Sequence, residues 1–384
     1  MERRDFIRKG GLTGLAGLGA ASLALQSFTP VDGSNPDSRL NVRDFGAKGD
    51  GKTSDTKAIQ DALDAAGKIG GTVWFPAGTY LCHDLKVPPY VTLLGDPVWI
   101  FRCEERGAVL KLDDPEADCL LDVTASYGVR VRGLVICGIR DARKEIHGIY
   151  LNNTEAWSPK EDTIVIDDTK VMYFSGHGVF LKRVWLFIVR HSHFMSNRLD
   201  GMHMLGWDGF VLDNQFSGNG GNGFGCDYCG ATVMFTANRV EWNGGYGLFI
   251  HAGDDWNVTG NSFDRNHGAG LYALHATAVA VTGNVFRRCG KDSAKLAPGE
   301  RSCQVKLEDC HGLTMTGNAC LAGQDDGGAG LFTPQVGLII KDLSHCVISG
   351  NTLWNGYMED MLVDQGGHGP DLIIKDNVGC PKKD

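Results

Sequence analysis

The sequence predicts an all-β fold in which short parallel strands stack into a solenoid, a parallel β-helix, closed at its N-terminal end by one capping α-helix. Three observations predict it: a repeat of 22–24 residues, 53 glycines between short apolar runs, and one amphipathic segment ahead of the first run. Repetitive β folds of this length commonly form one unit. We therefore expect a single solenoid domain over residues 31–384, with residues 39–81 as its cap and first coil.

The first 30 residues differ from the rest of the chain. Arg3 and Arg4 precede the segment DFIRK, and a run rich in glycine, alanine and leucine extends from Gly10 to Leu25. This arrangement resembles a twin-arginine export signal, and the run is shorter than the ~20 apolar residues of a membrane span. We expect residues 1–30 to be removed after export, leaving a periplasmic or secreted bacterial protein without stable membrane insertion.

The segment GAKGDGKT at residues 46–53 matches the phosphate-loop pattern G-x-x-x-x-G-K-[ST]. A phosphate loop follows a buried strand within a βαβ unit, whereas the preceding LNVRDF alternates and no βαβ unit follows. We interpret the segment as an entry turn and expect no nucleotide. Thr53–Asp55 would supply the N-cap of a helix over Ser54–Ala66. The apolar face of this helix would cover the first coil and contains Ala58, Ile59, Ala62, Leu63 and Ala66.

Two columns of the repeat keep one period. Glycines recur at positions 178, 201, 223, 247 and 270, and the second column contains His191, Asn214, Asn238, Asn261 and Asn284. A repeat this short has no room for a crossover helix, so strands must stack on strands. We expect the asparagines to pair with backbone groups at a bend, and to continue at Asn318, Asn351 and Asn377. Earlier strands are expected at His147–Asn152 and Thr163–Asp168, and projecting loops at residues 291–302 and 321–335.

Charge and cysteine content narrow the class of protein. The formal net charge is −9, or −11 without the four basic and two acidic groups of residues 1–30, which argues against nucleic acid as a partner. All twelve cysteines lie beyond residue 80, several of them at apolar strand positions. We expect mainly core thiols, although export permits disulfides. The C-x-x-C of Cys226 and Cys229 lacks the second pair that a zinc site needs.

The stretch NVRDFGAKGDGKTSDTKAIQDALDAAGKIGGTVWFPAGTYL at residues 41–81 resembles the opening of the pectate-lyase-like superfamily, which includes rhamnogalacturonase-like and epimerase-like proteins. The resemblance implies a right-handed, single-stranded parallel β-helix and a polysaccharide or oligosaccharide partner. Members of the superfamily include hydrolases, lyases, epimerases and phage tail proteins, and some are trimers, so an oligomer is compatible with the resemblance. The fold alone does not select one of these activities.

The motifs of polygalacturonase-type hydrolases in that superfamily are incomplete here. Leu199-Asp200-Gly201 matches the Asp of the first motif without its Asn-Thr. Gly176-His177-Gly178 matches the Gly-His-Gly motif, but one rung before Asp200 instead of two after it, and Gly221-Asn222 replaces the pair of carboxylates. The hydrolase mechanism of that group is therefore not transferred to this chain.

Side chains two and four positions after each glycine are expected to point outward. The first outward column contains Tyr150, Phe180, His203, Gly225, Phe249 and Tyr272, and the second contains Asn152, Lys182, Leu205, Asp227, His251 and Leu274. An outward aromatic row needs cover, either from a loop or from sugar rings that stack on it. We predict a carbohydrate groove in which Tyr150, Lys182, Phe249 and Tyr272 bind substrate.

Five titratable residues are the catalytic candidates: His177, Asp200, His203, Asp227 and His251. Asp227 and His251 share a column in consecutive rungs, roughly 4.8 Å apart, and His203 is expected roughly 8 Å from Asp227. A carboxylate flanked by imidazoles suits general acid–base catalysis, although a surface ion pair would have the same pattern. Asp200 and Asp227 are expected roughly 15–17 Å apart, too far for a glycosidase pair. A loop carboxylate from Asp254, Asp255 or Glu308 would then have to complete either site.

These candidates predict an exported enzyme that cleaves a polysaccharide, with a glycoside hydrolase favoured. One alternative is a lyase or epimerase acting on uronate-containing glycans, in which Lys182, Arg183 or Lys306 would neutralise the carboxylate. A second alternative is a glycan-binding or structural β-helix without turnover. No outward row of three acids with calcium spacing appears in consecutive rungs, so we expect neither a metal nor a cofactor.

Overall fold

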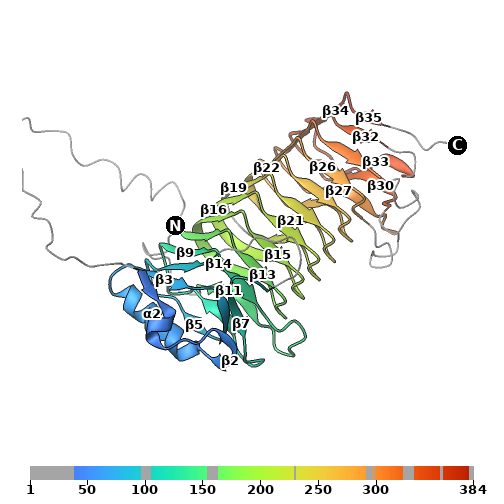
Figure 1. The fold of residues 1–384 in the computed structure, drawn as a ribbon. Coiled ribbons are helices and arrows are strands. Elements are labelled where there is room, and N and C mark those ends of the chain that lie inside the picture. Colours follow the sequence, from blue (N-terminus) through green and yellow to red (C-terminus); the bar gives the residue numbers. More distant parts are fainter. Residues whose placement is uncertain are drawn as a thin grey trace, which may run out of the picture. The chain divides into compact units, whose positions relative to one another are not determined.

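Figure 1 shows the computed structural model of the chain, in which the strands of successive rungs stack from the blue N-terminal end to the red C-terminal end. The structure describes residues 39–96, 105–153, 163–228, 231–290, 296, 299–322, 333–354 and 358–379. The predicted export signal lies outside these residues, as do most of the predicted loops at 291–302 and 321–335. Among the described residues no helix has the length and apolar character needed to cross a membrane.

The rungs contribute strands to three faces, and the strand pairs within the faces are parallel. The first face contains β5 (Leu85–Lys86), β8 (Cys119–Asp122), β11 (His147–Asn152), β14 (Val179–Arg190), β16 (Met202–Leu212), β18 (Phe224–Asp227), β21 (Leu248–His251), β24 (Leu271–Leu274), β27 (Cys303–Glu308), β30 (Val336–Lys341) and β33 (Asp360–Asp364). The predicted all-β parallel solenoid is confirmed.

The second face shares β14 and β16 with the first, because these two long strands run across both faces. Its other strands are β1 (Arg39–Asn41), β3 (Thr72–Phe75), β6 (Thr92–Gly95), β9 (Val129–Arg132), β12 (Ile164–Asp167), β19 (Ala231–Thr236), β22 (Asp254–Thr259), β25 (Ala280–Thr282), β28 (Thr314–Thr316), β31 (Cys346–Ser349) and β34 (Leu372–Lys375). The third face is a separate sheet made of β2 (Asp50–Ser54), β4 (Gly78–Cys82), β7 (Ala108–Leu112), β10 (Val135–Cys137), β13 (Lys170–Met172), β15 (His193–Met195), β17 (Gln215–Ser217), β20 (Arg239–Glu241), β23 (Ser262–Asp264), β26 (Val285–Arg287), β29 (Ala319–Leu321), β32 (Thr352–Trp354) and β35 (Val378–Gly379).

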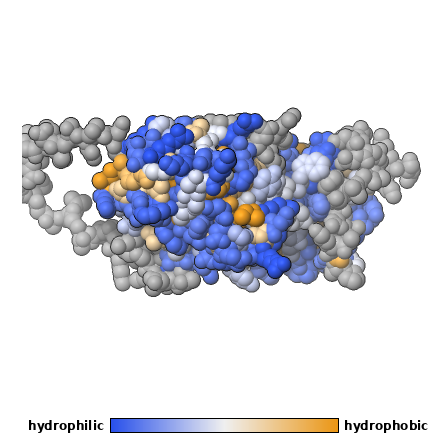
Figure 2. All heavy atoms as spheres, turned by 60° about the horizontal axis from the view of Figure 1, so that its bottom comes forward, coloured by the Kyte–Doolittle hydropathy of each residue, from blue (hydrophilic) through white to orange (hydrophobic). Residues whose placement is uncertain are grey.

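The core lies inside the coil, where apolar side chains from the faces stack rung over rung. Phe194 packs on Phe216 with ring centres 5.1 Å apart, and Phe263 packs on Phe286 at 4.9 Å. Free cysteines behave as part of this core, as predicted, since all of those described are buried: Cys82, Cys119, Cys137, Cys289, Cys303, Cys310, Cys320 and Cys346. Cys226 takes part in a disulfide. The outer surface in Figure 2 is mostly hydrophilic, with apolar atoms in small separate patches.

Two ladders of buried asparagines hold the bends between faces. The predicted ladder is confirmed from Asn214 to Asn377: each side-chain amide donates to the carbonyl oxygen of the next asparagine, as from Asn214 Nδ2 to Asn238 Oδ1 at 3.1 Å. The sequence analysis missed a second ladder, which contains Asn197, Asn219, Asn243 and Asn266. This second ladder lies just before the first-face strands and therefore sets the height of each rung where the candidate site begins.

The N-terminal cap follows the prediction except at its helix start. Helix α2 runs from Thr56 to Gly67 and buries Ile59, Ala62, Leu63 and Ala66, the predicted apolar face. The expected N-cap hydrogen bond is absent, because the Asp55 carboxylate instead accepts the N–H groups of Lys48 and Gly49 at 2.6 and 2.9 Å. The loop that resembles a phosphate loop thus binds a carboxylate of its own chain.

Candidate active site

The first-face register places the predicted columns as expected. Phe180 pairs with His203, His203 with Gly225, and Gly225 with Phe249. In the second column Asp227 pairs with His251. The outward columns derived from the repeat are therefore confirmed.

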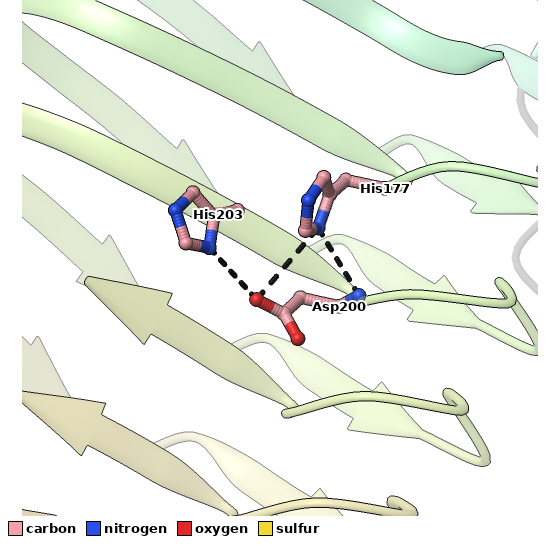
Figure 3. Close-up of side chains that lie close together, drawn as sticks. All are labelled: His177, Asp200 and His203. Atoms are coloured by element: carbon pink, nitrogen blue, oxygen red, sulfur yellow. Dashed lines mark hydrogen bonds and ion pairs between the residues drawn. The ribbon is translucent and has the colours of Figure 1, made fainter. Parts of the chain in front are cut away.

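The five candidate catalytic residues form one continuous row across four rungs. Asp200 Oδ2 lies 3.7 Å from His177 Nδ1 and 2.8 Å from His203 Nδ1, between the two imidazoles (Figure 3). His203 Nε2 lies 3.6 Å from Asp227 Oδ2, and Asp227 Oδ1 lies 3.2 Å from His251 Nδ1. Carboxylates and imidazoles thus alternate along the row, an order that permits proton transfer between neighbours.

The expected separation of Asp200 and Asp227 was wrong. His203 contacts both carboxylates, one through each ring nitrogen, so a single imidazole bridges a gap predicted at roughly 15–17 Å. The expected gap between His203 and Asp227 was too long for the same reason. Both estimates used backbone positions along the strand, whereas the side chains of Asp200 and Asp227 lean toward His203 and close the distance.

Backbone groups hold the column that precedes the first-face strands. The N–H of His177 donates to His147 Nδ1, and the N–H of Asp200 donates to His177 Nδ1, both at 3.1 Å. One rung on, the N–H of Asn222 donates to Asp200 Oδ1 at 2.6 Å. Because Nδ1 of His177 is an acceptor, a neutral His177 carries its proton on Nε2. This ladder fixes both the tautomer of His177 and the direction of the Asp200 carboxylate.

The histidines of the site have opposite pKa shifts. Burial lowers the pKa of His177 to about 4, although Asp200 opposes the change, and burial lowers the pKa of His147 to about 3. Burial also disfavours the charged form of His203, but its hydrogen bond to Asp200 and the charges of Asp200 and Asp227 outweigh burial and raise its pKa above the ordinary value. Near neutral pH the site therefore holds a neutral imidazole beside one that is readily protonated.

Glycines make room for the Asp200 carboxylate. A Cβ atom added to Gly225 would lie 2.5 Å from Asp200 Oδ2, and one added to Gly221 would lie 2.3 Å from Asp200 Oδ1. Both distances are shorter than any normal contact, so a side chain at either position would displace the carboxylate.

Two aromatic groups flank the row of titratable residues. Upstream, Tyr150 stacks on His147 at 5.2 Å between ring centres and on Phe180 at 5.6 Å. Downstream, Phe249 lies 5.3 Å from Tyr272 and 5.4 Å from Tyr246. His203 and Gly225, the two positions of the outward aromatic column without a Phe or Tyr, thus lie between two aromatic groups, an arrangement that suits a sugar ring.

The predicted substrate-binding residues do not share one environment. Tyr150 and Phe249 are partly exposed, and Lys182 is exposed. Tyr272 is buried, and its hydroxyl donates to Glu308 Oε2 at 2.8 Å. Glu308 also accepts hydrogen bonds from Lys341 and contacts Lys306, so it is not available to complete the site, and Asp254 begins β22 on the second face.

His177, Asp200 and His203 also form a possible set of metal ligands. One ligand atom from each lies within 4.8 Å of the others, and two imidazoles with a carboxylate are ligands that transition metals accept. The Nδ1 atoms of both histidines are already engaged, by the Asp200 N–H in His177 and by the Asp200 carboxylate in His203. The expectation of a metal-free site stays a prediction.

Comparisons with known proteins agree with this fold. Residues 39–114 match the family described as rhamnogalacturonase A/epimerase, pectate lyase-like, and residues 122–286 and 177–320 match the family described as right handed beta helix region. Mannuronan C5-epimerase AlgE5 of Azotobacter vinelandii is 29% identical over 60% of this chain, and alginate lyase 7 of the same organism is 30% identical over 48%. These matches span only 24% and 23% of the two relatives.

Solved structures show the same architecture. The A-module of mannuronan C5-epimerase AlgE6 from Azotobacter vinelandii superposes with a TM-score of 0.65 at 18% identity, covering 90% of this chain and all of that module. Tailspike protein 2 of an Escherichia coli O157:H7 bacteriophage superposes with a TM-score of 0.63 at 12% identity, covering 86% of this chain and 46% of the tailspike. At these identities the likeness concerns the fold. The chain belongs to the family described as right handed beta helix region, and its N-terminal part, residues 39–114, is similar to the rhamnogalacturonase A/epimerase, pectate lyase-like family.

Proposed function

We propose that the protein acts on a uronate-containing polysaccharide by removing the C5 proton of a uronate residue, the step shared by lyases and C5-epimerases. The row from His177 to His251 is the observation that supports it. The hydrolase favoured in the sequence analysis receives no support from the relatives, which are named as epimerases and a lyase. The alternative considered there is therefore the better one.

In this proposal the pair of Asp227 and His251 supplies the base. Asp227 Oδ1 lies 3.2 Å from His251 Nδ1, which orients the ring and leaves Nε2 free to accept the C5 proton. Asp227 is 44% exposed and His251 is 17% exposed, so the pair can be reached from the surface.

His203 and Lys182 would balance the charge that develops on the substrate. When the C5 proton leaves, its electron pair delocalises into the carboxylate, and a nearby cation stabilises the resulting dianion. His203 is held for this role by Asp200 at 2.8 Å, and its longer 3.6 Å contact to Asp227 leaves the Nε2–H free for a substrate carboxylate. Among the described residues Lys182 forms no ion pair, and it lies on the same face.

The two outcomes differ only after this step. In elimination the electron pair forms a C4–C5 double bond as the C4–O bond breaks, and the leaving oxygen takes a proton. In epimerisation a proton returns to C5 from the opposite face. The test is therefore exchange of the C5 hydrogen in D₂O, followed by NMR, for epimerisation, and ultraviolet absorbance of unsaturated ends for elimination, whose product has no hydrogen on C5.

The variants His251→Gln and Asp227→Asn should each lower C5 exchange about 10²-fold or more. The matched control is the pair of His83 and Asp113, an Nδ1 to carboxylate contact of 2.7 Å at the end of β4 on the third face. His83→Gln should leave exchange unchanged. New reducing ends with neither C5 exchange nor unsaturated ends would show hydrolysis, and retention of glycan without any product would show binding only.

We infer that the protein meets this substrate outside the cytoplasm, since the proposed glycan is extracellular and residues 1–30 resemble an export signal. Cell fractionation of the wild type and of an Arg3→Lys, Arg4→Lys variant tests this. Retention of the variant in the cytoplasm is the expected result, and equal export of both proteins would contradict it.

A further inference from the structure

A pocket opens beside the first face, downstream of the proposed reaction centre. Its volume is about 240 Å³, enough for one sugar ring but not for several. Tyr246 lines it and occupies the column of Asp200 and Asn222, two rungs beyond Asp200, or about 10 Å along the coil. The pocket and the reaction centre therefore lie along one line on the same side of the molecule.

The walls of the pocket combine an aromatic ring, glycine backbone and polar side chains. Main chain of Gly245 and Gly268 lies next to Tyr246, and Ser302 and Lys306 also line the pocket. Flat aromatic rings bind the C–H faces of sugars, while hydroxyl and amine groups bind their oxygens. The lining thus matches a carbohydrate residue.

The two described cations that line the pocket, Arg301 and Lys306, already have carboxylate partners. Lys306 Nζ lies 3.1 Å from Glu308 Oε2 and 3.7 Å from Glu300 Oε1, and 4.7 Å from the centre of the Tyr272 ring. Arg301 contacts Glu359 at 3.0 Å and Asp360 at 2.6 Å. Among the described lining residues a ligand carboxylate would find no unpaired cation, and it would face Glu300.

Uncharged sugar hydroxyl groups need no unpaired cation and are not repelled by Glu300. A sugar hydroxyl can accept from Lys306 and donate to Glu300 without breaking the pair that each forms, because each group keeps further hydrogen-bonding capacity. We propose that this pocket is a subsite for one uncharged sugar residue of the same chain whose uronate occupies the reaction centre. The presence of a uronate in the reaction centre rests on the proposed function, whereas the subsite for an uncharged sugar does not. It predicts a substrate in which uronate and neutral sugar residues occur in one chain.

Binding of two oligosaccharides of equal length tests the proposal by calorimetry on the full chain. One contains only uronate residues, and the other alternates uronate with a neutral hexose. The wild type should bind the mixed oligosaccharide about tenfold more tightly. Tyr246→Ala should remove this preference. Tyr246→Phe, which keeps the aromatic ring, should retain most of the preference and serves as the control for loss of the ring.

Glu300→Gln gives the opposite result. Lys306 keeps its contact to Glu308, but the variant removes the negative charge that a ligand carboxylate would face, so the uronate oligosaccharide should bind several-fold more tightly than it binds the wild type. The matched controls are Tyr90→Ala and Lys57→Met, exposed residues far along the chain from the pocket, which should change neither affinity. Equal wild-type affinity for both ligands, or no effect of Tyr246→Ala, would overturn the subsite.

The two proposals fail separately. Preference for the mixed oligosaccharide that depends on Tyr246, with neither C5 exchange nor unsaturated ends on any glycan, would keep the subsite and refute the chemistry. C5 exchange without that preference would keep the chemistry and refute the subsite.

Discussion

Asp55 in the N-terminal cap and Asp200 on the first face are both buried carboxylates held by backbone N–H groups. Asp55 accepts from Lys48 and Gly49, one on each oxygen, so main chain satisfies the whole carboxylate. Asp200 accepts the N–H of Asn222 on one oxygen, and its other oxygen faces the two imidazoles. Backbone hydrogen bonds position a carboxylate in either place, but only titratable partners beside it make proton transfer feasible.

The same substitution at both positions should separate the two roles. Asp200→Asn should lower kcat/KM for C5 exchange about 10²–10⁴-fold, because an amide cannot hold a proton on His203. The Asn Oδ1 atom can still accept the N–H of residue 222, so the thermal midpoint should change little. Wild-type exchange by this variant would show that the row is not the reaction centre.

Asp55→Asn should act on stability instead. The amide nitrogen would face a backbone N–H of Lys48 or Gly49, leaving one buried donor unpaired, which costs about 1–3 kcal/mol. Urea unfolding measures the loss, and kcat/KM of the folded variant should equal that of the wild type. An unchanged free energy of unfolding would mean that the loop does not depend on this carboxylate.

Gly225→Ala tests how closely the site must be held. The new Cβ would lie 2.5 Å from Asp200 Oδ2, so the carboxylate must turn away from His203, and we expect about a tenfold loss in kcat/KM. Gly379→Ala is the control, because its Cβ would meet nothing closer than 3.3 Å, the Met361 side chain. Equal rates for the two variants would remove the positioning role from Gly225.

The smallest effect concerns pH. The pKa of His203 is raised in the folded state by Asp200 and Asp227 against the effect of burial, so the stability from this contact is present below about pH 6.5 and is lost as pH rises through the folded-state pKa. The contribution of His177 to stability has the opposite pH dependence. Burial lowers the pKa of His177 to about 4, so this contribution is lost as pH falls from about 6.5 to 4.

Unfolding free energies measured against pH check both signs. His203→Gln should flatten the profile on the alkaline side, and His177→Gln should flatten it on the acidic side. A profile that neither variant changes would mean that these pKa shifts contribute nothing to folding.

The ladders of asparagine show what periodicity reveals and what it hides. Asn214, Asn238 and Asn261 were found because they repeat with the glycines. Asn219 and Asn243 repeat with the same period, five residues after members of the first ladder, so the N-x₄-N spacing was an available signal for the second ladder. It was missed because two bends in each rung were not considered.

Sequence alone determined the coil, the strand register and the column that each outward residue occupies, because a constant period and strict alternation leave one way to stack parallel strands. Tertiary structure alone decided which of these residues meet. Side chains of Asp200 and Asp227 reach His203 along the strand, the Asp55 carboxylate turns to a loop instead of its helix, and Tyr272 gives its hydroxyl to Glu308. Backbone spacing follows from the repeat, whereas side-chain direction depends on neighbours that only folding brings together.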